Sequence, residues 1–174
     1  MVSDQDLQRL SVRLGRQLLT AEARLVTAES CTAGWIAKAL TDVPGSSDWF
    51  ESGYVCYSNE SKIRDLGVLA ATLAGPGAVS EPTVREMATG ALARTGADIA
   101  VAVTGIAGPT GAVPGKPVGT VWFAVAYRRG HAVEVNARVK FFKGDRDSVR
   151  RKSVQFALQQ VLALERPEGP DIQS

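Results

Sequence analysis

Five stretches of the chain repeat hydrophobic residues at the spacing of an α-helix. The pattern predicts helices over residues 3–20, 32–43, 59–68, 77–96 and 145–165. The apolar stripe of the first helix consists of Leu7, Leu10, Leu14 and Leu18. Residues able to cap an amino end stand at or near four of the starts, namely Ser3, Asn59, Ser80 and Asp145.

Five other stretches have the hydrophobic pattern of strands. They cover residues 23–30, 53–58, 97–105, 118–129 and 131–142. The third, ADIAVAVTG, is apolar almost throughout, which is typical of a strand buried on both faces. The last two are separated by a tight polar turn and predict an antiparallel hairpin.

Helices and strands alternate along most of the chain, which indicates an α/β fold. We expect a three-layer α/β/α sandwich with a mixed, mostly parallel sheet that includes an antiparallel hairpin strand. No linker or internal repeat divides the sequence, so we predict a single domain over residues 1–166, followed by a polar tail over 167–174.

Composition narrows the classes of function. The 174 residues carry a net charge of +2 without a basic stripe, which argues against a nucleic-acid-binding protein. Neither a signal peptide nor a long apolar segment is evident, so we expect a cytoplasmic protein without a membrane partner. Two cysteines and one histidine are too few for a structural zinc site. The histidine, His131, falls in the hairpin turn, so a histidine base is not expected.

Polar residues collect where three predicted strands end, in TAES (27–30), YSNE (57–60) and TG (104–105). In open α/β sheets the ligand crevice lies outside the carboxyl ends of parallel strands. We therefore expect these three clusters to face one crevice. The candidate contacts from these clusters and the turn after the first are Glu29, Ser30, Thr32, Asn59, Thr104 and Gly105.

The segment from Ser47 to Lys62 carries groups able to pass protons, with Tyr57 between them. A serine nucleophile needs a base, and a lysine serves when burial or a nearby cation keeps its amine neutral. A helix cap, an edge tyrosine and a solvated lysine would explain the same residues without catalysis. Composition and spacing leave both interpretations open.

The turn ESCTAG leads from the first strand into a helix, and its free N–H groups could hold a phosphate with Ser30 and Thr32. Plain capping by either residue explains the turn equally well. The Gly/Pro-rich segment 106–117 lacks the first glycine and the Ser/Thr of a phosphate loop. We interpret that segment as a flexible loop over or beside the site.

Six blocks in order resemble the CinA C-terminal domain family: TAESCTAGWIAKALTDVPGSSDWF, GYVCYSNESK, GAVSEP, VAVTGIAGP, KPVGTVWFA and GDRDSVRR. The resemblance spans about residues 5–165. It implies a pyridine-nucleotide amidohydrolase that converts nicotinamide mononucleotide (NMN) to nicotinic acid mononucleotide and ammonia. It further implies an α/β/α fold, no metal or other cofactor, and a homo-oligomer, with a dimer favoured.

By the same resemblance, the catalytic serine falls on Ser47, its lysine on Lys62 and its tyrosine on Tyr57, with Thr104 at the substrate. A supporting arginine falls on Arg146, with Arg150 as the alternative. We expect Arg146 to lower the pKa of the lysine by like-charge repulsion.

Two positions depart from the family's usual pattern, Ala33 in place of glycine and Cys56 in place of threonine. Three rival hypotheses remain. The first is a non-catalytic nucleotide-binding regulatory module linked to competence or DNA damage. The second is a hydrolase that uses the thiol of Cys31, and the third is a hydrolase that uses Ser30 as its nucleophile.

Overall fold

The computed structural model describes residues 2–164. The strands are β1 (Leu25–Glu29), β2 (Phe50–Val55), β3 (Ile99–Gly105), β4 (Thr120–Arg129) and β5 (Ala132–Phe141). The helices are α1 (Asp4–Thr20), α2 (Trp35–Thr41), the 3-10 helix η1 (Ser46–Asp48), α3 (Asn59–Leu66), α4 (Ala70–Ala74), α5 (Glu81–Ala93) and α6 (Arg146–Leu162). The polar tail predicted over 167–174 lies outside the described residues. Within them, no helix has the length and apolar character needed to cross a membrane.

The strands form one sheet in the order β2-β1-β3-β4-β5. Strand β1 pairs in parallel with both β2 and β3, whereas β4 pairs antiparallel with β3 and β5. The predicted mixed sheet with an antiparallel hairpin is therefore confirmed. The chain passes from β1 to β2 by way of α2 and returns to β3 by way of α5, on the other face. This makes the carboxyl end of β1 the switch point of the sheet, where ligands bind in folds of this kind.

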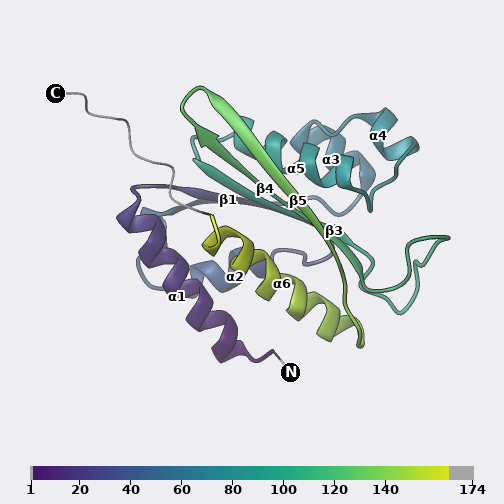
Figure 1. Cartoon of the computed structure of the whole chain (residues 1–174), viewed down its shortest axis with the longest axis horizontal. Coiled ribbons are helices and arrows are strands. Elements are labelled where there is room, and N and C mark those ends of the chain that lie inside the picture. Colours follow the sequence, from purple (N-terminus) through teal and green to yellow (C-terminus); the bar gives the residue numbers. More distant parts are fainter. Residues whose placement is uncertain (1, 165–174) are drawn as a thin grey trace.

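Helices cover both faces of the sheet, as the predicted three-layer sandwich requires. Figure 1 shows α1, α2 and α6 on one face and α3, α4 and α5 on the other. The two faces have separate cores, because successive side chains of a strand point to opposite sides. In β3, Val101 and Val103 belong to the α1/α2/α6 core, whereas Ala100 and Ala102 belong to the α5 core. Small alanine side chains let α5 lie close to the sheet.

Most predicted elements are present, with shifted ends. Helix α2 begins only after Gly34, because Ala33 and Gly34 adopt left-handed conformations, with φ of 52° and 88°. The cap of α3 is Ser58, which accepts a hydrogen bond from the Ser61 N–H, and Asn59 is the first residue of the helix. Helix α4 was not predicted: its five residues carry no side-chain cap and only Thr72 is buried.

Candidate active site

The parallel strands bring their polar carboxyl ends to one place, as the sequence predicts. There a cavity of about 320 Å³ opens between the ends of β1, β2 and β3. The predicted site residues that line it are Ser30, Tyr57, Lys62, Thr104, Gly105 and Arg146. The rest of the wall comes from Cys31, from Ala78 and Val79 before α5, and from residues 106–108, 110 and 111 of the Gly/Pro-rich loop. The loop was predicted to lie over or beside the site, and its position in the cavity wall confirms this.

Lys62 is the central charged residue of this cavity. Lys62 is only 1% exposed, because α3 directs its side chain inward against the end of β1. The Nζ atom lies 3.1 Å from the Ser30 Oγ, and it donates to the carbonyl oxygens of Cys56 and Tyr57, each at 3.0 Å. Burial lowers the pKa of the Lys62 ammonium.

The acceptors around Nζ, which include the Ser58 carbonyl at 3.5 Å, accommodate an ammonium as well as a neutral amine. A neutral amine has two N–H groups and one lone pair, and the two carbonyls at 3.0 Å accept the two N–H groups. The lone pair is then available to the Ser30 hydroxyl. The expected cause of the lowered pKa was repulsion by Arg146. Burial is the main cause instead.

Arg146 lies at the start of α6 and joins two walls of the cavity. Its Nη1 donates to the Gly108 carbonyl at 2.8 Å, and its Nη2 donates to the Tyr57 hydroxyl at 3.1 Å. Tyr57 is 60% exposed, so its hydroxyl stands at the mouth of the cavity. Because that oxygen accepts from an arginine, its own proton remains free to be donated.

Arg150 follows one turn later in α6 and is not a lining residue. Its guanidinium instead donates to the Cys31 and Thr32 carbonyls, so of the two arginines it is Arg146 that reaches the cavity.

Thr104 and Gly105 end β3 beside the cavity. The Thr104 hydroxyl donates to the Ala78 carbonyl at 2.8 Å and thereby fixes the segment before α5 to the end of β3. Its oxygen can still accept a hydrogen bond from a ligand.

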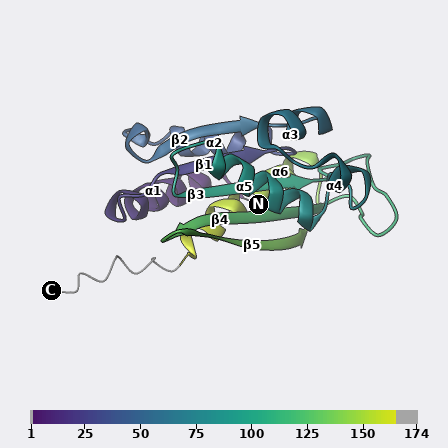
Figure 2. The ribbon, with the colours of Figure 1, turned by 90° about the horizontal axis from the view of Figure 1, so that it is seen from above.

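Ser47 lies elsewhere. It is an exposed residue of η1 and precedes β2, whereas Lys62 follows that strand. Six residues of strand separate the two, which is about 20 Å at roughly 3.3 Å per residue. Figure 2 shows α3 beyond the arrowhead of β2, at the end away from the start of the strand. Within one chain the expected pairing of Ser47 with Lys62 is therefore wrong, and Ser30 is the serine beside the lysine.

Three further candidates from the strand ends lie outside the cavity lining. The Glu29 carboxylate is buried and accepts from the N–H groups of Ile36 and Ala37, at 3.0 and 2.8 Å. Those two N–H groups are therefore not available to a phosphate at the start of α2. Thr32 is buried with its hydroxyl unpartnered, and Asn59 is exposed on α3, and neither lines the cavity.

Cys31 does line the cavity, but its thiol is poorly suited to act as a nucleophile. Burial raises the pKa of the Cys31 thiol to about 12. At neutral pH roughly one thiol in 100,000 is then ionised, and the thiolate is the reactive form.

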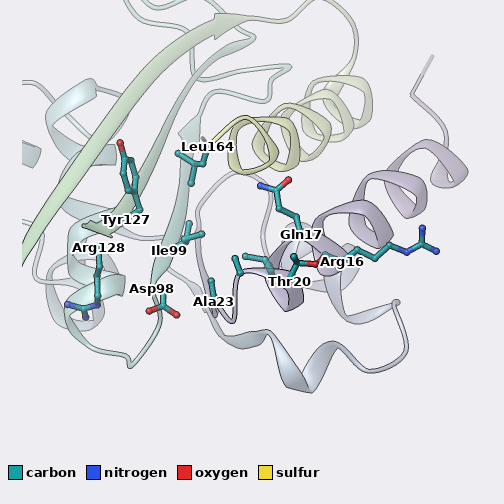
Figure 3. A pocket seen from close by; sticks show the side chains of 11 residues that line it. Arg16, Gln17, Thr20, Ala23, Asp98, Ile99, Tyr127, Arg128 and Leu164 are labelled. Carbon is teal, nitrogen blue, oxygen red and sulfur yellow. The ribbon is translucent and has the colours of Figure 1, made fainter. Parts of the chain in front are cut away.

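A second cavity of about 450 Å³ lies at the opposite end of the sheet (Figure 3). It is bounded by the end of α1, the start of β3 and the end of β4. The Asp98 carboxylate there accepts from the Arg24 N–H, and Arg128 donates to the Ala97 and Leu92 carbonyls. The described residues around it include no serine or cysteine, so it has no counterpart to the pair of Ser30 and Lys62.

Comparisons with known proteins agree with this fold. A sequence model of the CinA C-terminal domain matches residues 7–164. The chain is 53% identical to nicotinamide-nucleotide amidohydrolase PncC of Escherichia coli K12 over 91% of this chain and 94% of that protein. It is 51% identical to PncC of Pseudomonas putida over 89% and 94% of the two chains.

Among solved structures, the competence/damage inducible protein CihA from Agrobacterium tumefaciens superposes with a TM-score of 0.85 at 42% identity. The match covers 91% of this chain and 94% of that one. The family model, the relative from Escherichia coli and the solved structure each match about nine tenths of the chain, and the chain belongs to the CinA C-terminal domain family.

Proposed function

We propose that this protein hydrolyses the carboxamide of NMN to nicotinic acid mononucleotide and ammonia, with Ser30 as nucleophile and Lys62 as base. The observation that carries the mechanism is the buried amine of Lys62, 3.1 Å from the Ser30 hydroxyl inside the cavity. The names of two relatives, which match 91% and 89% of the chain, support the substrate.

The first half of the reaction forms an ester. The Ser30 Oγ attacks the amide carbon, which the pyridinium ring makes more electrophilic, and its proton passes to the Lys62 Nζ. The departing nitrogen must gain a proton, because an amide ion does not leave unaided. The protonated Lys62 supplies it, either directly or through the Tyr57 hydroxyl, which gives up its own proton and regains one from Lys62. Lys62 is then neutral again, and ammonia leaves while the nicotinoyl group remains on Ser30.

The second half returns the enzyme to its starting state. Lys62 takes a proton from a water molecule, the resulting hydroxide attacks the ester carbon, and the proton goes back to the Ser30 oxygen. We assign Arg146 to the nucleotide phosphate, because it is the exposed cation at the mouth of the cavity. Thr104 is assigned to the substrate as a hydrogen-bond acceptor.

Ammonia release from NMN by the wild type, Ser30→Ala and Ser47→Ala tests this assignment. We expect Ser30→Ala to lose about 10³-fold or more in kcat, as nucleophile variants do, and Ser47→Ala to keep most of the activity. An acyl-enzyme trapped by rapid acid quenching should carry its added mass on the peptide that contains Ser30. Full activity in Ser30→Ala together with loss in Ser47→Ala would refute the nucleophile. Tight NMN binding without ammonia release by the wild type would instead favour the regulatory module.

The homo-oligomer, with a dimer favoured, and the cytoplasmic location are kept as part of this proposal. The resemblance to the family supports both. Light scattering coupled to size-exclusion chromatography gives the mass of the species in solution. A monomer at working concentration would contradict the proposed homo-oligomer.

A further inference from the structure

Arg150 connects the last helix to the turn that carries the proposed nucleophile. Its Nε donates to the Cys31 carbonyl at 3.1 Å and its Nη2 donates to the Thr32 carbonyl at 3.0 Å. The guanidinium also lies over the ring of Trp35, 5.2 Å from the ring centroid. One planar side chain thus holds the carbonyls of the two residues that follow Ser30.

The turn needs such support because its backbone is strained. Ala33 has a φ of 52°, a left-handed conformation that is unfavourable for a residue with a Cβ. Strained backbone of this kind persists where the surrounding structure over-determines it. Three other contacts hold the turn. The Ser30 N–H donates to the Val103 carbonyl at 3.0 Å, and the Ala33 N–H donates to the Ser30 carbonyl at 3.1 Å. The Trp35 N–H donates to the Thr32 carbonyl at 3.2 Å, so that carbonyl accepts from both Trp35 and Arg150. Arg150 adds the contact from the α6 side of the sheet.

We propose that Arg150 is a positioning residue for catalysis: by holding the Cys31 and Thr32 carbonyls it keeps the Ser30 hydroxyl within reach of Lys62. This inference rests on the proposed function, in which Ser30 is the nucleophile. The carbonyl and N–H of a trans peptide point in opposite directions. Fixing the Cys31 carbonyl therefore also fixes the direction of the Thr32 N–H.

Arg150 itself does not line the cavity, whereas Arg146, one turn earlier, does. A variant at Arg150 therefore removes no side chain from the cavity wall and acts through the turn that carries Ser30. Misplacing a reacting group by about 1 Å can cost about 10²-fold in rate. The effect should appear in kcat, while KM changes little.

Arg151 provides a matched control. It is the neighbouring arginine of α6, and its guanidinium lies over the same Trp35 ring, 4.8 Å from the centroid. Its ion pairs are with Asp4 and Asp147, and neither carbonyl of the turn is among its hydrogen-bond partners. Arg151→Ala therefore removes one charge and one ring contact from α6 without releasing the turn.

The experiment measures kcat, KM and Tm for Arg150→Ala, Arg150→Lys and Arg151→Ala with NMN as substrate. We expect Arg150→Ala to lose about 10- to 100-fold in kcat, and millimolar guanidinium to restore part of the loss. The kcat of Arg150→Lys should lie between those of Arg150→Ala and the wild type, because an ammonium cannot hold both carbonyls with the geometry of a planar guanidinium. Arg151→Ala should lower Tm and keep kcat near the wild-type value.

A kcat for Arg150→Ala within about twofold of the wild type would overturn the inference, as would equal losses in Arg150→Ala and Arg151→Ala. If Arg150→Ala fails to fold, Arg150→Lys decides: a wild-type kcat there overturns the inference, and a lowered kcat at unchanged KM supports it. Failure of the proposed function is a separate result, because it appears as retained activity in Ser30→Ala whatever Arg150 does.

Discussion

Substituting Gly90 by alanine should disturb both stability and catalysis. Gly90 lies in α5, where the end of α3 crosses it. A Cβ at this position would stand 1.8 Å from the Leu66 carbonyl oxygen, and real Cβ atoms essentially never approach closer than 3.0 Å. Because the obstacle is backbone, no side chain can rotate away, and α3 must move. Arg94 also donates to that carbonyl at 3.0 Å and would lose its geometry.

The net cost follows from two opposing effects. Overpacking of this kind costs up to about 3 kcal/mol, whereas alanine gains about 1 kcal/mol over glycine within a helix. The difference, about 2 kcal/mol, corresponds to a Tm lower by about 4–8 °C for a chain of this size. Lys62 lies one turn before Leu66 in α3, so the same movement lengthens its distance from Ser30 and lowers kcat.

Thermal unfolding by circular dichroism and ammonia release from NMN measure the two effects. Gly96→Ala is the matched control, because a Cβ there meets nothing within 4 Å, and we expect its Tm to stay within about 2 °C of the wild type. A Tm for Gly90→Ala equal to or above that of the wild type would show that the crossing of α3 over α5 is looser than this geometry requires.

Three further predictions concern titration, the thiol and the buried carboxylate. Lys62 must be neutral to accept a proton, and burial lowers its pKa. We therefore expect log(kcat/KM) to rise with pH and to level off below pH 10.5, the ordinary pKa of a lysine. A plateau reached only above pH 10.5 would contradict this. Cys31→Ala should remain active. Iodoacetamide should inactivate the native enzyme only slowly, since burial raises the pKa of the Cys31 thiol to about 12. Rapid inactivation at neutral pH would support the hypothesis of a hydrolase that uses this thiol. Glu29→Gln should lower the free energy of unfolding by about 1–3 kcal/mol. The reason is that the NH₂ group of the glutamine would face a backbone N–H from which the carboxylate now accepts a hydrogen bond. An unchanged Tm with a raised KM would indicate that Glu29 contacts the substrate instead.

The sequence predicts the architecture well because its strongest patterns belong to the longest or most buried elements. The nearly unbroken apolar run of β3 and the polar turn between β4 and β5 each have one structural interpretation. The short helix α4 has no such pattern, and its residues are held by contacts with α5, including the Thr72 hydroxyl that donates to Glu86. Tertiary contacts of this kind are not visible in a local window.

The site shows where reasoning from sequence succeeds and where it stops. Polar strand ends predicted the position of the cavity, because strand direction decides which ends meet. The same rule, applied to Ser47, would have excluded it, since that serine precedes β2 and so lies at the amino end of a parallel strand.

The roles of Lys62 and Glu29 could not be predicted in this way. A lysine in a short helix is usually solvated, and a carboxylate at a strand end usually faces solvent or a ligand. Only the packed structure shows that Lys62 turns inward to Ser30 and that Glu29 holds the start of α2.

The reach of Arg150 across 118 positions to Thr32 has a consequence for how the protein is made. The proposed nucleophile lies in the first fifth of the chain, yet one contact that holds its turn comes from the final helix. During synthesis the sheet residues all emerge before α6, so a sheet can assemble while the Ser30 turn still lacks its last support. Full activity therefore becomes possible only late in synthesis. A nascent chain that ends before α6 would contain the three strands around the cavity but would lack Arg150 and the contacts that it makes with the Ser30 turn.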